Sequence, residues 1–174
     1  MKTKNLIFLA VVILSLSCSK VTIPEGAQAY RPFDLEKYLG KWYEIARIDF
    51  KYESGLINTT AEYSLNKNGT VKVLNRGYDT LKNKWQEAIG KAKLVNENDI
   101  AMLKVSFFGP FYSGYNVISI DSNYNYALVI GESLDYLWIL SRQPYIPDNI
   151  KLHYLTIAKK IGYDTNKILW ISQN

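Results

Sequence analysis

The stretch that decides the fold is YLGKWYEIAR, at residues 38–47, which leads into a long first strand over residues 42–50. Successive side chains of a strand point to opposite faces. An inward-facing Trp42 therefore predicts that Glu44, Ala46 and Ile48 face inward as well. Glu44 is then the one carboxylate of an otherwise apolar set, held either by neighbouring polar groups or by a ligand.

Short strands separated by turns continue to residue 141. The clearest turn is Asn66-Lys67-Asn68-Gly69, because Asn and Gly tolerate the positive φ angles of a tight hairpin. Eight strands are predicted, at residues 42–50, 59–65, 70–78, 84–95, 100–108, 115–120, 124–130 and 134–141. Neighbouring strands joined by hairpins leave two exposed edges unless the sheet closes on itself. The sequence thus predicts an all-β, eight-stranded up-and-down antiparallel barrel with room for one small ligand, with an immunoglobulin-like sandwich as the rival fold.

The only extended helical pattern follows the last predicted strand. Ile150, Tyr154, Ile157 and Ile161 recur at helical spacing, and Gly162 ends the run. This apolar stripe needs a surface to cover it, and the outside of the barrel supplies one. A short final strand is predicted over residues 167–172.

The N-terminal residues resemble an export signal. Lys2 and Lys4 precede the apolar run 6–14, and Cys18 follows directly after the small residue Ser17. This order predicts a lipoprotein signal peptide at residues 1–17, an acylated Cys18 in the outer membrane of a Gram-negative cell, a tether over residues 18–32 and a barrel domain over residues 33–174. An ordinary secretory signal with an incidental cysteine is the alternative.

Composition narrows the functional classes. A chain of 174 residues with 48% hydrophobic and 21% charged residues is typical of one globular domain. The net charge of +5 comes from interspersed charges of both signs, which argues against nucleic-acid binding. One Cys and one His exclude an internal disulfide and the usual zinc cages, so no metal or cofactor is predicted.

Three motifs together resemble the lipocalin family, and within it the bacterial outer-membrane lipoproteins and their apolipoprotein D-like relatives. They are the Gly40-Lys41-Trp42 signature, the block LKVSFFGPFYSGYNV at residues 103–117 and DYLWILSR at residues 135–142. The resemblance covers the chain from about residue 33 onward. It implies a barrel that is closed at one end and holds a hydrophobic molecule.

A barrel with an apolar interior needs a plug at one end. Trp42 offers a large flat indole, and the guanidinium of Arg142 can stack on it and donate hydrogen bonds to nearby carbonyls. The resemblance also implies this closing pair. If Arg142 faces inward, alternation predicts the same for Leu140, Trp138 and Tyr136.

The predicted ligand-binding residues follow from this alternation and from the position of Tyr112 after the Gly109-Pro110 turn, at a rim of the barrel. They are Glu44, Ala46, Leu103, Val105, Phe107, Tyr112, Tyr136 and Trp138. The predicted ligand is a fatty acid, a lysophospholipid or another phospholipid, stored or moved at the outer membrane.

The sequence does not favour an enzyme. The motifs G-x-S-x-G, H-E-x-x-H and G-x-G-x-x-G are absent, and His153 lies on the predicted outer helix, beside its apolar stripe. Two other functions stay open: an anchored structural protein of the envelope without a ligand, and a carrier of another hydrophobic molecule such as a pigment. Pairing of two copies also stays open.

Overall fold

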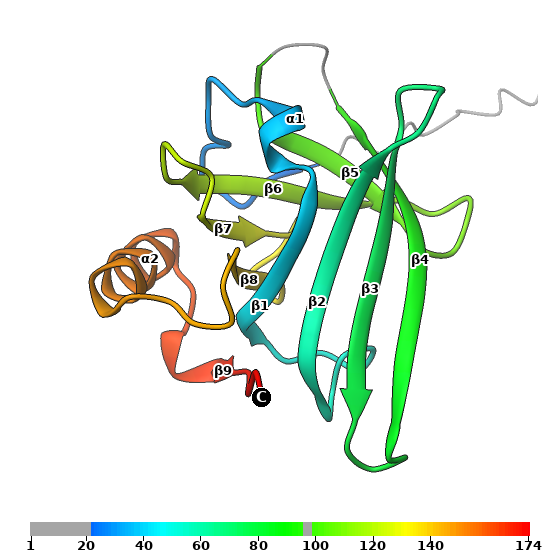
Figure 1. Ribbon diagram of the computed structural model, residues 1–174. Helices are drawn as coiled ribbons and strands as arrows, with labels where there is room; N and C mark the ends of the chain where they lie inside the picture. Colours follow the sequence, from blue (N-terminus) through cyan, green and yellow to red (C-terminus); the bar gives the residue numbers. More distant parts are fainter. Residues whose placement is uncertain (1–21, 96–98) are drawn as a thin grey trace, which may run out of the picture.

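The computed structural model describes residues 22–95 and 99–174. Nine strands form one antiparallel sheet (Figure 1). The strands are β1 (Gly40–Ile48), β2 (Leu56–Leu65), β3 (Val71–Asp79), β4 (Lys84–Leu94), β5 (Met102–Ser106), β6 (Ser113–Ile120), β7 (Tyr126–Ile130), β8 (Leu137–Ser141) and β9 (Ile168–Trp170).

The first eight strands close into a barrel because β1 pairs with both β8 and β2. Trp42 lies opposite Ala61 of β2 in this closing pair. Every other neighbour along the barrel is also the neighbour in sequence. The predicted eight-stranded up-and-down barrel is therefore confirmed, although several strands are shorter than predicted: the strand expected over residues 100–108 covers only Met102–Ser106.

The two ends of the barrel differ. A one-turn helix, α1 (Leu35–Tyr38), which the sequence did not predict, lies at the closed end, where the Asp34 carboxylate caps it by accepting from the Glu36 backbone N–H at 3.0 Å. Figure 1 shows α1 at one end and the β3–β4 turn at the other. We call this second end the mouth, and its four loops are residues 49–55, 80–83, 107–112 and 131–136.

The predicted helix is α2 (Asp148–Ile161), and it lies outside the barrel (Figure 1). Its stripe packs on the outer sides of β1, β7 and β8, where Tyr154 and Ala158 are buried with Leu128 and Ile139. The predicted final strand is β9, which pairs with the last residues of β1. Within the described residues, neither helix is long and apolar enough to cross a membrane.

A bulge in β1 overturns part of the predicted alternation. The pairing of β1 with β8 shifts between Glu44 and Ala46. Ile45 and Ala46 consequently both pack in the outer cluster under α2. Beyond the bulge the faces are exchanged: Ile48 also packs outside, while Arg47 lies opposite the inward-facing Trp138. The predicted inward orientation of Ala46 and Ile48 is therefore wrong.

Candidate functional site

Trp42 and Arg142 form the floor of the barrel. Trp42 is 0% exposed, and the guanidinium carbon of Arg142 lies 3.8 Å from the centre of its indole ring. Arg142 also donates hydrogen bonds to the backbone carbonyls of Lys41, Lys37 and Leu39, each at 2.8 Å. This cation–π contact and fan of hydrogen bonds join α1, β1 and the end of β8.

Three tyrosines stand above this floor. The hydroxyl of Tyr115 lies 2.6 Å from that of Tyr38 and 2.7 Å from that of Tyr63. Burial raises the pKa of all three phenols, so they act as neutral hydrogen-bonding groups. They satisfy one another across the barrel and leave the aromatic faces to the apolar interior.

The β4–β5 side of the interior is apolar. Leu103 is fully buried near the closed end, whereas Val105 and Phe107 pack against the same core but stay partly exposed. The Phe107 ring lies where a side chain on Gly90 would be, since a Cβ there would stand 2.8 Å from the ring. Partly exposed side chains on the inner face show that solvent reaches this part of the barrel.

Aromatic rings line the interior near the mouth. Trp138 stacks on Tyr136 at 6.2 Å and on Tyr115 at 6.3 Å between ring centres. Phe50, from the mouth loop after β1, packs edge-on against Tyr136 and Trp138 at 5.5 and 5.9 Å. These rings form a second, half-exposed aromatic layer near the mouth, whereas Trp42 lies at the closed end.

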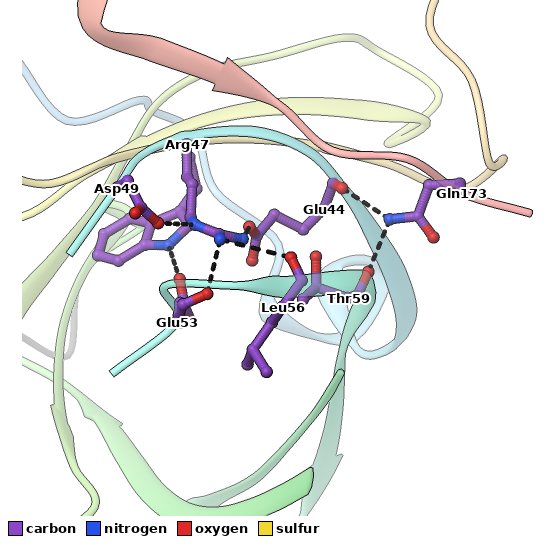
Figure 2. Close-up of polar contacts among 8 residues, drawn as sticks. Glu44, Arg47, Asp49, Glu53, Leu56, Thr59 and Gln173 are labelled. Carbon is purple, nitrogen blue, oxygen red and sulfur yellow. Dashed lines mark hydrogen bonds and ion pairs between the residues drawn. The ribbon is translucent and has the colours of Figure 1, made fainter. Parts of the chain in front are cut away.

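A buried ion cluster surrounds Arg47 on the inner face of β1 (Figure 2). Arg47 is 0% exposed, and it donates to the Glu44 carboxylate at 2.9 Å, to Asp49 at 2.9 Å and to the backbone carbonyl of Glu53 at 2.6 Å. The Glu53 carboxylate in turn accepts from the indole N–H of Trp138 at 3.1 Å. One guanidinium therefore pairs with two carboxylates, Glu44 and Asp49, and the Glu53 carboxylate is held by Trp138 instead.

The buried carboxyl groups of this cluster have raised pKa values. Burial raises the pKa of Glu44 to about 8; the charge of Glu53 adds to this rise, and Arg47 opposes it. Burial raises the pKa of Glu53 as well, against the hydrogen bond from Trp138 and the charge of Arg47. The cluster thus holds protons more readily than free carboxyl groups do, and it favours a positive neighbour.

The C-terminal residues complete the wall beside this cluster. Gln173 donates its side-chain amide to the Glu44 carbonyl at 2.8 Å and to the Thr59 carbonyl at 3.0 Å, and so bridges β1 and β2 where they separate (Figure 2). Thr59 is 4% exposed. Within residues 22–95 and 99–174, its hydroxyl has no hydrogen-bond partner, and neither has the buried amide oxygen of Asn75.

The structure distributes the predicted site residues over two faces. Glu44, Leu103, Val105, Phe107 and Trp138 face the interior, and Tyr136 stacks on Trp138 near the mouth. The predicted interior position of Ala46 is wrong because of the bulge. The predicted ligand contact of Tyr112 at the rim is also wrong: its ring lies on the outer side, 5.5 and 5.8 Å from the ammonium groups of Lys93 and Lys104, a cross-strand pair on the outer face of β4 and β5.

Sequence reasoning missed the polar interior. Regular alternation from Trp42 would place Arg47 on the outer face, and the loop residue Glu53 has no periodicity that would place it. Tyr63 and Tyr115 alternate correctly with inward-facing neighbours, so the same pattern that found Val105 could have found them. Among the described residues, no group of three His, Cys, Asp or Glu side chains is placed to hold a metal ion.

Comparison with known proteins identifies the barrel. The model of a lipocalin-like domain matches residues 33–173. The chain is 49% identical over 160 residues to the outer membrane lipoprotein Blc of Citrobacter freundii, covering 92% of this chain and 90% of that protein. It is 35% identical over 150 residues to mouse apolipoprotein D, covering 81% and 77%. This chain therefore belongs to the lipocalin family, of the type that joins these bacterial lipoproteins with apolipoprotein D.

Other comparisons agree. Outer membrane lipoprotein Blc of Vibrio cholerae is 46% identical over 152 residues, covering 87% of this chain and 89% of that protein. Insecticyanin from the tobacco hornworm shares the fold at a TM-score of 0.71 and 18% identity, with 88% and 87% of the two chains covered. The bacterial relatives support the predicted location of this chain, lipid-anchored at the outer membrane.

Proposed function

We propose that this lipocalin binds a single-chain lipid inside the barrel and holds it at the outer membrane. The observation that carries the proposal is that the solvent exposure of the inner side chains rises from the closed end toward the mouth. The floor around Trp42 is sealed and fully buried, whereas Val105, Phe107 and Trp138 stay partly exposed toward the mouth. A chain-shaped apolar ligand fits such a one-ended interior.

The energy of burial favours a long acyl chain over a small polar solute. About 15 methylenes at about 0.8 kcal/mol each contribute roughly 12 kcal/mol. The lost freedom of the ligand costs several kcal/mol. The net binding free energy is then about −8 kcal/mol, which corresponds to micromolar affinity. A sugar or amino acid has no comparable apolar surface to bury.

The ion cluster favours a lysophospholipid with an ammonium head group over a free fatty acid. A fatty-acid carboxylate near Glu44 and Glu53 would lie where burial already disfavours negative charge, as the raised pKa values of both carboxyl groups indicate. An ammonium group would instead find carboxylate oxygens and, on Phe50, Tyr136 and Trp138, aromatic faces that attract cations. The same interior is suited to binding rather than catalysis.

Titration of the delipidated protein with lysophosphatidylethanolamine and with palmitate tests the proposal. Both should change the tryptophan fluorescence saturably, and the first should bind more tightly. Trp138→Phe should remove most of the change, whereas Trp170→Phe, a substitution on the outer surface, should not. Absence of saturable binding for both lipids would favour the anchored structural protein or the carrier of another molecule.

We also propose that residues 1–17 are removed as a signal peptide and that Cys18 carries the lipid anchor. Both lie outside the described residues, and the bacterial relatives named as lipoproteins support the assignment. Mass spectrometry of the mature protein should find acyl groups on Cys18. A soluble product cleaved at another residue would contradict the assignment.

A further inference from the structure

Residues 22–32, the described part of the tether, run along the outside of the barrel and lead into Phe33. Phe33 donates its backbone N–H to the carbonyl of Asp99, in the β4–β5 connection at the closed end, at 2.8 Å. Tyr30 donates to the carbonyl of Val117, partway along β6, at 2.8 Å. Followed backward, the chain thus leads from the closed end toward the mouth.

The first described residue lies on the mouth side. The side-chain amide of Asn116 donates to the Thr22 carbonyl at 3.4 Å and to the Gly131 carbonyl at 3.1 Å. Gly131 is the first residue of the mouth loop between β7 and β8. Thr22 is therefore held beside the base of a mouth loop.

The short distance from Thr22 to Cys18 limits where an anchor can lie. Cys18 precedes Thr22 by four positions, and a chain spans at most about 3.3–3.6 Å per residue, or about 14 Å here. The acyl chains on Cys18 are therefore attached within about 14 Å of the base of this mouth loop.

The mouth also carries the side chains that a membrane would cover. Its loops expose five large apolar residues, which are Tyr52 (63%), Leu81 (86%), Phe108 (67%), Phe111 (77%) and Leu134 (44%). Tyr52 and Phe108 join two of these loops, with 5.9 Å between their ring centres. Two turns of the closed end, at residues 66–69 and 121–125, are mostly polar in sequence, and among the described residues near that end only Leu65 (51%) and Tyr145 (62%) are exposed large apolar side chains. Aromatic and apolar groups of this kind favour the membrane interface.

We propose that the mouth is a membrane-docking surface, seated on the bilayer that holds the anchor. The inference rests on the proposed acylation of Cys18, and it goes beyond lipid binding because it fixes which end of the barrel meets the membrane. Its consequence is that a lipid passes between bilayer and barrel without crossing water.

The charges of the mouth indicate which force holds it there. The four loops carry two lysines, Lys51 and Lys82, and four acidic residues, Asp49, Glu53, Glu132 and Asp135. This excess of carboxyl groups gives no attraction to anionic lipids, so apolar contact carries the docking. Docking should accordingly change little when the anionic lipid fraction or the salt concentration is raised.

Site-specific labelling tests the orientation in the full-length acylated protein, reconstituted in vesicles of phosphatidylethanolamine and phosphatidylglycerol at about 3:1. Because acylation blocks the thiol of Cys18, one added cysteine is a unique site for an environment-sensitive fluorophore. Gly109→Cys places it in a mouth loop, where a Cβ meets no atom within 4 Å. Lys67→Cys places it in an exposed closed-end turn. The label at 109 should shift to shorter wavelength and be quenched by brominated lipids, while the label at 67 should not. Equal responses, or a stronger response at 67, would overturn the proposal.

Lipid transfer gives a second, independent test. The double substitution Phe108→Ser and Phe111→Ser should slow uptake of lysophosphatidylethanolamine from vesicles by about tenfold, and should leave binding of the same lipid from water unchanged. Leu152→Ser, equally exposed at 67% but on α2, is the matched control. Unchanged uptake in the double variant would overturn the docking surface. The labelling experiment needs no ligand, so a failure of lipid binding in water would count against the proposed function alone.

Discussion

Arg47 and Glu44 form a 2.9 Å ion pair inside the barrel, although a regular strand places residues three positions apart on opposite faces. The bulge between Glu44 and Ala46 brings both side chains to the inner face. Bulges are frequent near functional sites because they redirect a side chain. Here the result is a buried guanidinium surrounded by carboxylates at mid-depth in the interior.

Removing the guanidinium should destabilise the protein strongly. Arg47→Met leaves Glu44 and Glu53 buried without their cation, and breaking one side of a buried pair costs about 3–5 kcal/mol. Urea unfolding at pH 8 should show this loss, and the loss should be smaller at pH 5, where the carboxyls take up protons. Arg76→Met is the control, because its 3.4 Å pair with Glu87 lies on the surface and is worth at most about 1 kcal/mol. Equal losses for both variants would contradict the buried pair.

Glu44 should make stability depend on pH. Its pKa is about 8 in the folded protein, against 4.5 as the ordinary value. Between these values the folded state binds more protons than the unfolded state, so the free energy of unfolding falls as pH rises, by at most about 1.4 kcal/mol per unit for one carboxyl. Glu44→Gln should flatten this slope in urea unfolding at pH 5, 6.5 and 8. Glu62→Gln, on the exposed face of β2, should leave it unchanged, and a parent-like slope in Glu44→Gln would count against this assignment.

The fold was predictable because its determinants are local. Local residues determine the alternating strands, the Asn68-Gly69 hairpin and the apolar stripe of α2. The pair Trp42 and Arg142 is distant in sequence, and it was predictable because an apolar barrel needs a plug at one end. The family resemblance pointed to the same barrel.

The inner face was predictable only where strands are regular. The side chains of Leu103, Val105 and Phe107 face the interior as alternation predicts, whereas one extra residue at Ile45 exchanges the faces of Ala46 and Arg47. Nothing in the letters EIAR marks the bulge. Tyr112 was misplaced for a related reason: a loop has no periodicity, and contact with two outer lysines depends on the tertiary fold.

The closing pair should contribute much of the stability. Trp42→Ala removes a fully buried indole and its contact with Arg142, which should cost about 3–5 kcal/mol and lower the Tm sharply in thermal unfolding. Trp170→Ala provides a matched control. Its ring also has a cation above it, Lys151 at 3.9 Å, but it is 38% exposed, so the loss should be much smaller. Similar Tm values for the two variants would show that Trp42 does not plug the barrel.

The Tyr115 hydroxyl should stabilise the interior through its two partners. Tyr115→Phe keeps the ring that stacks on Trp138 but removes the contacts of 2.6 and 2.7 Å with the hydroxyls of Tyr38 and Tyr63. Both of these buried groups then lose a hydrogen-bond partner, which should lower the free energy of unfolding by about 1–3 kcal/mol. Tyr112→Phe removes the same atom from a ring on the outer face, and its effect should stay within about 0.5 kcal/mol. Urea unfolding of the two variants beside the parent measures the difference. The lipid affinity of Tyr112→Phe should also match that of the parent, since this ring lies outside the barrel. A larger loss of stability or affinity in Tyr112→Phe than in Tyr115→Phe would mean that Tyr112, and not Tyr115, belongs to the interior.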